Sequence, residues 1–144
     1  MLTLMAGTDL LATLRRTILA GTPTLATCAG VILLANEVTQ PAQASLGVLD
    51  VTVARNAYGR QVDSTVAPVA TSEAAGLGVD TIEGVFIRAP KIVRVGPGVE
   101  VLARRGIDPV LVRQGRLLAA TFHPELSVRS AVIELFVRLL DGER

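Results

Sequence analysis

The sequence predicts an α/β domain, in which helices cover the faces of a β-sheet. Two observations support this fold class. Apolar segments with helical spacing alternate along the chain with short runs rich in Val, Ile and Leu, as in proteins whose helices pack on a sheet. In addition, 50% of the residues are hydrophobic but only 3% are aromatic, so the core must be aliphatic. At 144 residues we expect a single domain spanning residues 1–144.

Three segments have the periodicity of amphipathic helices, and they span residues 8–21, 29–38 and 127–144. Thr8 is the expected N-cap of the first helix, and Gly21 can end it. The side chains expected to face the core are Leu10, Leu11, Leu14, Ile18 and Leu19 in the first helix, and Val128, Val132, Leu135, Phe136 and Leu139 in the last.

Six segments read as strands because they are short, apolar and bounded by turn residues. They span residues 22–27, 46–55, 83–90, 99–104, 108–114 and 116–123. Residues 66–80 are the least patterned, so we expect a loop or an irregular edge there. The chain opens on a helix rather than on a strand, which leads us to expect that the front of the fold is missing.

Composition excludes several classes of function. A net charge of +1, from 14 basic and 13 acidic residues, argues against an electrostatic nucleic-acid partner. No run approaches the ~20 apolar residues of a membrane helix, and the N-terminus lacks the basic region of a signal peptide. One cysteine and one histidine make a disulfide framework or a structural zinc site improbable. These features suit a reducing cytoplasm, with no membrane association.

Cys28, the only cysteine, stands between a strand-like run and a helix-like run. The positive end of a helix lowers a thiol's pKa and favours the thiolate. Small neighbours permit the tight turn that exposes a nucleophile, and the backbone N–H of Ala29 could then donate to an oxyanion. The alternative is that Cys28 fills the core, because cysteine is among the most buried residue types. This segment alone leaves both interpretations open.

His123, the only histidine, follows a buried strand, and Glu125 lies two residues further on. In an extended backbone, residues i and i+2 point to the same side, so the carboxylate can orient the imidazole, with Pro124 stiffening the segment. Alternatively, His123 is a strand-end residue beside a solvated glutamate. Taken with Cys28, the pair forms a coherent catalytic set, since active sites gather at the carboxyl ends of strands.

Several segments in order, "GTPTLATCAGVILLA", "GVLDVTVARNAYGRQVDS", "FIRAP", "VGPGVEVLA" and "VRQGRLLAATFHPEL", resemble the glutaminase-subunit family of pyridoxal 5'-phosphate synthases, which are class I glutamine amidotransferases. The resemblance covers nearly the whole chain. It implies a flavodoxin-like fold, a three-layer arrangement with helices on both faces of the sheet.

The resemblance also implies a function. The family hydrolyses L-glutamine to L-glutamate and ammonia, and passes the ammonia to a synthase subunit, a (β/α)8 barrel, in a hetero-oligomer. The nucleophile falls on Cys28, its supporting pair on His123 and Glu125, and the glutamine contacts on Arg55, Ile87 and Arg88. We expect no cofactor and no metal.

Family members begin with strands and a helix that lead into a Gly-Gly-Glu-Ser segment, and Met1 falls just after the corresponding point. We therefore expect an N-terminally truncated domain that exposes apolar sheet surface and strand edges. A catalytically inactive truncated paralogue, acting only as an interaction protein, is the alternative function. A cysteine hydrolase acting on another amide is a third reading, but Arg55 and Arg88 favour glutamine.

Overall fold

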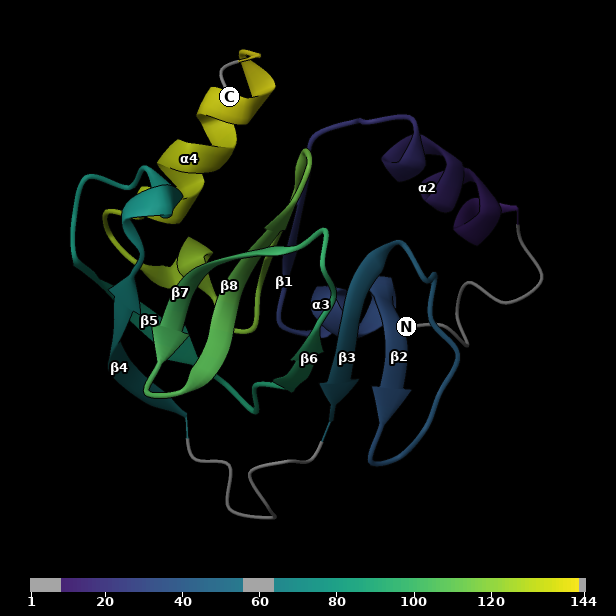
Figure 1. Cartoon of the computed structure of the whole chain (residues 1–144), viewed down its shortest axis with the longest axis horizontal. Coiled ribbons are helices and arrows are strands. Elements are labelled where there is room, and N and C mark those ends of the chain that lie inside the picture. The colour runs from purple at the N-terminus through teal and green to yellow at the C-terminus, as the bar shows by residue number, and fades with distance from the viewer. Residues whose placement is uncertain (1–8, 56–63, 143–144) are drawn as a thin grey trace.

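The computed structural model describes residues 9–55 and 64–142, which form two β-sheets and their covering helices (Figure 1). The larger sheet has six strands in the order β1-β9-β8-β7-β4-β5, and the smaller has three in the order β2-β3-β6. The strands are β1 (Thr24–Thr27), β2 (Ala35–Thr39), β3 (Leu49–Ala54), β4 (Thr65–Thr71), β5 (Thr81–Phe86), β6 (Lys91–Val95), β7 (Glu100–Arg105), β8 (Asp108–Gln114) and β9 (Leu117–Ala120).

Both sheets are mixed. β1 runs parallel to β9 and β2 runs parallel to β3, whereas the other pairs of described strands are antiparallel. β7, β8 and β9 form a meander with two tight turns. Gly106 and Gly115 occupy these turns at a φ of 59°, a left-handed conformation that costs glycine little because it has no Cβ.

The central strands β8 and β9 are buried on both faces, and their side chains alternate between two cores. Val112, Leu117 and Ala119 belong to a cluster with side chains of α3 and β3. Leu111, Leu118 and Ala120 belong to a second cluster, which includes the buried face of the C-terminal helix. The core thus has two layers separated by the larger sheet, and the second layer includes Phe86 and Phe122 beside its aliphatic side chains.

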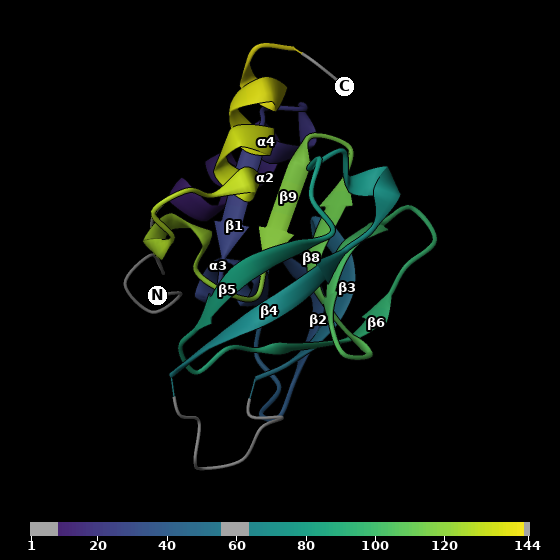
Figure 2. The ribbon, with the colours of Figure 1, turned by 90° about the vertical axis from the view of Figure 1, so that its left-hand side faces the viewer.

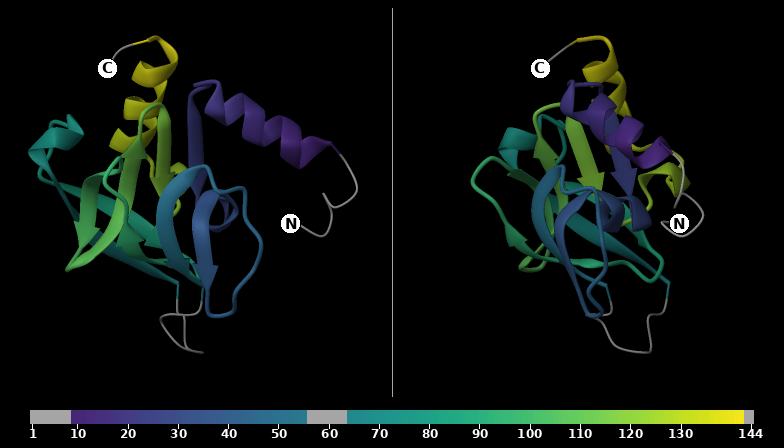
Figure 3. Two further views of the ribbon diagram at one scale, coloured as in Figure 1. Left: turned by 45° about the vertical axis from the view of Figure 1, so that its right-hand side comes forward. Right: turned by 90° about the vertical axis from the view of Figure 1, so that its right-hand side faces the viewer.

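Among the described residues, the α-helices are α2 (Leu10–Leu19), α3 (Ala29–Leu34) and α4 (Ala131–Leu140), and the 3₁₀ turns are η1 (Glu73–Ala75) and η2 (Pro124–Leu126). α4 packs on one face of the larger sheet (Figure 2), and the Ser130 side chain caps it by accepting from the Ile133 N–H. α2 extends away from the sheets beyond β1 (Figure 3). Within the described ranges, no helix is long and apolar enough to cross a membrane.

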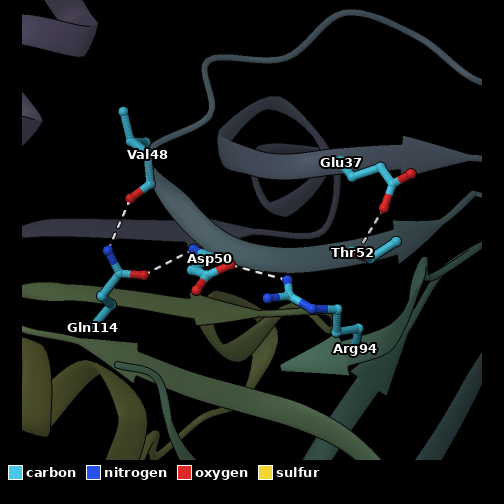
Figure 4. Close-up of polar contacts among 6 residues, drawn as sticks. All are labelled: Glu37, Val48, Asp50, Thr52, Arg94 and Gln114. Atoms are coloured by element: carbon cyan, nitrogen blue, oxygen red, sulfur yellow. Dashed lines mark hydrogen bonds and ion pairs between the residues drawn. The ribbon is translucent and has the colours of Figure 1, made fainter. Parts of the chain in front are cut away.

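A polar network joins the two sheets (Figure 4). The Gln114 side chain, at the end of β8, accepts from the Asp50 backbone N–H at 2.8 Å and donates to the Val48 carbonyl at 3.1 Å. Arg94 of β6 pairs with the Asp50 carboxylate at 2.9 Å. One side chain of the larger sheet therefore satisfies two backbone groups at the start of β3.

The predicted α/β class is confirmed, with helices on both faces of the larger sheet. Four expected strands correspond closely to β1, β3, β7 and β8, and a fifth is β9, which ends three residues before His123. The strand expected over residues 83–90 is only half right, because β5 begins at Thr81 and ends at Phe86. The second, smaller sheet was not expected. The predicted N-cap at Thr8 lies outside the described residues.

The predicted helix over residues 29–38 is wrong in its second half. α3 ends at Leu34, and Ala35 adopts an extended ψ of 150° as the chain turns directly into β2. β2 pairs in parallel with β3, and Val38 is buried between the elements of the first core. Tertiary pairing overrides the helix preference of Ala and Glu at these positions.

The loop or irregular edge expected over residues 66–80 is wrong for residues 66–71, because β4 pairs with β5 along its length and with β7 at Ala70 and Thr71. Residues 72–80 are irregular as expected, with only the short η1 turn. Pro68 obscured this strand, yet β7 pairs with β4 only beyond it, so its missing N–H is tolerated. β6 was missed altogether.

Two expected helix faces need correction. Leu10 and Leu19 of α2 are more than half exposed, so only part of the predicted stripe contacts the core. Val128 is fully exposed, because α4 begins at Ala131 rather than at residue 127. Both helices are shorter than their apolar patterns suggest.

Candidate active site

The parallel pairing of β1 with β9 brings the two candidate catalytic segments together. Thr27 lies opposite Ala120 at the carboxyl ends of these neighbouring strands. Cys28 directly follows β1, and its backbone N–H donates to the Ala120 carbonyl at 2.9 Å. His123 follows β9 by three residues. The prediction that adjacent strands present both residues at one sheet edge is therefore confirmed.

Cys28 occupies a sharp strand-to-helix turn. Its backbone has a φ of 47° and a ψ of −106°, a conformation that is costly for a residue with a side chain. The turn is also crowded: a Cβ at Gly30 would lie 3.3 Å from the Ala26 Cβ, so a small residue is needed there. Strain of this kind concentrates at functional positions and supports the nucleophile interpretation over simple core filling.

The Cys28 thiol is half-buried, and its Sγ donates to the Ile87 carbonyl oxygen at 3.7 Å. Burial raises the pKa of Cys28, and the Glu125 carboxylate raises it further, whereas the Ala29 backbone N–H and the Arg88 guanidinium lower it. The net pKa lies above the ordinary value, so the expected depression by the helix end is wrong. α3 has only six residues, and burial outweighs its field.

His123 and Glu125 form the expected pair, with Nδ1 and Oε1 2.7 Å apart. The geometry differs from the prediction, because Glu125 lies in the η2 turn and His123 immediately precedes that turn, rather than both lying in one extended strand. Pro124 occupies the first position of this turn, where its fixed φ and missing N–H are favourable. An imidazole held through Nδ1 presents Nε2 for proton transfer.

Ile87 and Arg88 immediately follow β5 and lie near Cys28. Ile87 provides the carbonyl that contacts the thiol, and the Arg88 charge acts on the Cys28 pKa. Arg88 is exposed and has a φ of 45°, a second strained backbone at this edge. The His123 N–H donates to the Val85 carbonyl at 2.9 Å, so the β5 and β9 segments are fixed to each other.

Arg55 is not brought into this group. It follows β3 in the smaller sheet, where its backbone N–H donates to the Thr39 carbonyl at 3.1 Å. In the part of the chain that the structure describes, its side chain forms no hydrogen bond or ion pair with the other candidate residues. Its assignment as a glutamine contact stays a prediction.

A cavity of about 410 Å³ opens beside the candidate site, and Cys28 and His123 both line it. Its wall follows β1 and is completed by apolar side chains of the flanking helices, so it is mostly hydrophobic. The other lining residues are Leu14, Ile18, Thr24, Leu25, Ala26, Thr27, Ala29, Gly30, Leu33 and Leu34. Ala29 is exposed at this surface, consistent with a backbone N–H that could meet a ligand.

Two buried aromatic residues next to the site were not among the predicted site residues. Phe86 and Phe122 are buried neighbours, and each directly precedes a candidate site segment. In "VFIR" and "TFHP" a Phe directly precedes a candidate site residue, but nothing in the sequence indicates that the two rings meet. Among the described residues, no group of three or more His, Cys, Asp or Glu side chains could hold a metal ion.

This arrangement can perform nucleophilic catalysis. It combines a thiol at a strained turn, an imidazole oriented by a carboxylate, and a backbone N–H beside the thiol. Because the pKa of Cys28 is raised, ionising the thiol near neutral pH calls for a base, and His123, which lines the same cavity, is the candidate.

The fold and this edge of the sheet place the chain among proteins with a glutamine amidotransferase structure. A crystal structure of a glutamine amidotransferase superposes on 96% of this chain and 72% of its own, with a TM-score of 0.83 and 42% sequence identity. Residues 1–141 match the SNO glutamine amidotransferase family, and the chain belongs to that family.

Two curated relatives are similar to the chain. The pyridoxal 5'-phosphate synthase subunit PdxT of Koribacter versatilis is 56% identical over 113 residues, which cover 78% of this chain and 57% of the relative. The corresponding PdxT subunit of Desulforudis audaxviator is 47% identical over 138 residues, covering 96% of this chain and 71% of the relative. The chain thus spans between about half and 71% of the length of such relatives.

Proposed function

We propose that this chain is the glutaminase component of a pyridoxal 5'-phosphate synthase, and that it hydrolyses L-glutamine to L-glutamate and ammonia. Its membership of the SNO glutamine amidotransferase family supports the reaction class. The similarity to relatives named as PdxT subunits supports the biosynthetic role.

The reaction follows from the chemistry of the three residues. His123 Nε2 removes the Cys28 thiol proton, and the thiolate attacks the carbon of the glutamine side-chain amide. The Ala29 backbone N–H donates to the oxyanion that forms. The C–N bond then breaks, and His123 returns its proton to the departing nitrogen. Ammonia is released, and the glutamyl group remains bound to Cys28 as a thioester. Water activated by His123 cleaves the thioester and releases glutamate and the Cys28 thiol.

Glu125 holds the imidazole in the tautomer that this sequence of steps needs. With Nδ1 donating to the carboxylate at 2.7 Å, Nε2 has the lone pair that accepts the thiol proton. The carboxylate also stabilises the imidazolium that forms after the transfer. Glu125 therefore acts through His123, rather than on glutamine.

Arg88 is the proposed contact for the glutamine α-carboxylate. A guanidinium binds a carboxylate with two parallel hydrogen bonds, whereas a lysine offers only a point charge. Arg88 lies near Cys28 and is exposed, so a bound substrate could reach both. Ile87 is proposed to contact glutamine through its backbone, and Arg55 is proposed as a further contact.

The ammonia is proposed to pass to a synthase subunit in a hetero-oligomer, because a glutaminase of this kind supplies nitrogen to another reaction. A cytoplasmic location fits this role, since a reducing compartment keeps Cys28 as a thiol. One observation carries the proposal most directly: Cys28 and the His123–Glu125 pair, remote in sequence, line or flank the same cavity.

A diazo-ketone analogue of glutamine tests the proposal. The intact chain, with and without the synthase subunit, is incubated with the analogue and the adduct is located by mass spectrometry. We expect one adduct on Cys28, slower labelling when glutamine competes, and no adduct in Cys28→Ser. Labelling of Cys28 that glutamine does not slow would contradict a glutamine site and favour the inactive paralogue.

A further inference from the structure

Two buried phenylalanines directly precede residues of the candidate site. The rings of Phe86 and Phe122 have centroids 5.5 Å apart and planes tilted by 48°, a favourable arrangement for an aromatic pair. Both side chains are buried, at 4% and 0% exposed. Phe86 ends β5 immediately before Ile87, and Phe122 follows β9 immediately before His123. The ring contact therefore connects the residues that precede Ile87 and His123.

The backbone around Phe86 is built to admit its ring. A Cβ at Gly84 would lie 2.7 Å from Phe86 Cε2 and 2.9 Å from Val69 Cγ2, both closer than packed atoms approach. Any larger residue at position 84 would displace the ring. On the same ring, the Arg105 guanidinium carbon lies 4.7 Å from the centroid, a cation–π distance. Gly84 and Arg105 thus both restrict the position of the Phe86 ring.

Two hydrogen bonds connect the chain neighbours of this pair with Cys28 and with the His123 segment. The His123 N–H donates to the Val85 carbonyl at 2.9 Å, which ties the segment after β9 to β5. One residue beyond Phe86, the Ile87 carbonyl accepts from the Cys28 thiol at 3.7 Å. The two rings therefore belong to residues that are direct chain neighbours of the groups in both hydrogen bonds.

We propose that Phe86 and Phe122 are positioning residues, with Gly84 as the space they require, and that they hold the His123 segment and the Ile87 carbonyl in register with Cys28. The inference deepens the proposed function, on which it rests. The two rings are not proposed to contact the substrate. They act through the residues that follow them in the chain, because a rigid support is what keeps a catalytic geometry within tolerance.

A core role alone would make a different prediction. Truncating any buried side chain lowers stability, but at temperatures where the protein is folded it leaves the chemistry of a remote thiol unchanged. Leu102 offers the matched comparison: it is 1% exposed, belongs to the same cluster, and lies on β7, which leads to none of the site segments.

The test compares Phe86→Leu, Phe122→Leu and Gly84→Ala with Leu102→Ala, each first shown to be folded by circular dichroism and thermal unfolding. The rate of Cys28 alkylation by iodoacetamide is measured against pH, and kcat and KM for glutamine are measured with the synthase subunit present. The double variant Gly84→Ala with Phe86→Leu removes the ring that an alanine would strike, so it replaces Gly84→Ala if that protein does not fold.

We expect the three site variants to move the midpoint of the alkylation profile to lower pH, because a loosened support exposes the thiol to water. We expect kcat to fall by up to about 100-fold, the scale of a misplaced catalytic group, with a much smaller change in KM. Leu102→Ala should keep the parent midpoint and kcat. Variants that behave like Leu102→Ala in both measurements would overturn the inference.

The two readouts separate this inference from the proposed function. If the alkylation midpoint moves in the site variants while no protein hydrolyses glutamine, the positioning role stands and the glutaminase proposal fails. If the parent hydrolyses glutamine and the site variants retain its kcat and midpoint, the glutaminase proposal stands and the positioning role fails.

Discussion

The backbone N–H of Cys28 donates to the carbonyl of Ala120 at 2.9 Å, three residues before His123. This hydrogen bond continues the parallel ladder of β1 and β9 by one step beyond Thr27. The pairing of β1 with β9 therefore determines how the segments that carry the thiol and the imidazole lie relative to each other. Strand pairing is among the stiffest features of a fold. Building a site on paired strands limits how far the two groups can drift apart.

The electrostatics of Cys28 predict opposite effects for its two charged neighbours. The Glu125 carboxylate raises the pKa of the thiol and the Arg88 guanidinium lowers it. Glu125→Gln should therefore move the midpoint of Cys28 alkylation by iodoacetamide to lower pH, and Arg88→Ala should move it to higher pH. In the parent, the midpoint should lie above that of an exposed thiol, because burial is the largest influence.

A pH series on purified, folded protein checks both signs at once. Cys28→Ser, which removes the reporter thiol, gives the baseline. Shifts of the same direction in the two variants, or a parent midpoint below that of a free thiol, would show that this electrostatic account of Cys28 is mistaken.

Substrate recognition gives a second prediction. If Arg88 holds the glutamine carboxylate, Arg88→Ala should raise KM for glutamine by about 10- to 100-fold, since a hydrogen bond to a charged group contributes roughly 1.5–3 kcal/mol. Arg104→Ala is the control, because the Arg104 guanidinium bonds the Ile107 carbonyl at the exposed β7–β8 turn. Equal KM and kcat values for the two variants would show that Arg88 is an ordinary surface residue and does not bind glutamine.

The junction between the sheets gives a third prediction, on stability. Gln114→Ala leaves the Asp50 N–H and the Val48 carbonyl without their partner (Figure 4), which should lower the free energy of unfolding by about 1–3 kcal/mol. Arg113→Ala, one residue earlier, removes only an exposed bond to the Gly115 carbonyl and should change stability by less than about 0.5 kcal/mol. Urea unfolding distinguishes them, and equal losses would contradict a clamp at Gln114.

Gly96 gives a fourth prediction, at the same junction. A Cβ there would lie 1.9 Å from the Asp50 carboxylate, which Arg94 holds at 2.9 Å. Gly96→Ala should therefore destabilise the protein by roughly 1–3 kcal/mol through crowding. Adding Asp50→Ala removes the obstructing atoms and should recover most of that loss in a double-mutant cycle. Strictly additive effects would show that the two residues do not compete for space.

Local pattern predicted much of this fold. The meander from β7 to β9 has Val- and Leu-rich strands separated by glycine turns, and its β8 bounds are those expected from the sequence. The placement of Cys28 and His123 after neighbouring strands was also predictable, because each follows a short apolar run in the sequence. These features depend on neighbours in the sequence, so a single sequence contains enough information to predict them.

Features that depend on distant neighbours were not predictable. The end of α3 at Leu34 is determined by β2 pairing with β3, and local propensity at residues 35–38 favours the helix. The raised pKa of Cys28 reflects burial and the charge of Glu125, neither of which is visible from the segment around the thiol. The contact between Phe86 and Phe122 joins two strands that are remote in sequence, and only the folded chain brings them together.

The most direct test of the account is glutamate release from glutamine, measured for the parent chain, Cys28→Ala and Leu102→Ala, each with and without the synthase subunit. We expect release by the parent when the synthase is present, background release by Cys28→Ala at equal folded concentration, and retained release by Leu102→Ala. A Cys28→Ala protein that releases glutamate at the parent rate would contradict the central claim that the Cys28 thiol is the nucleophile.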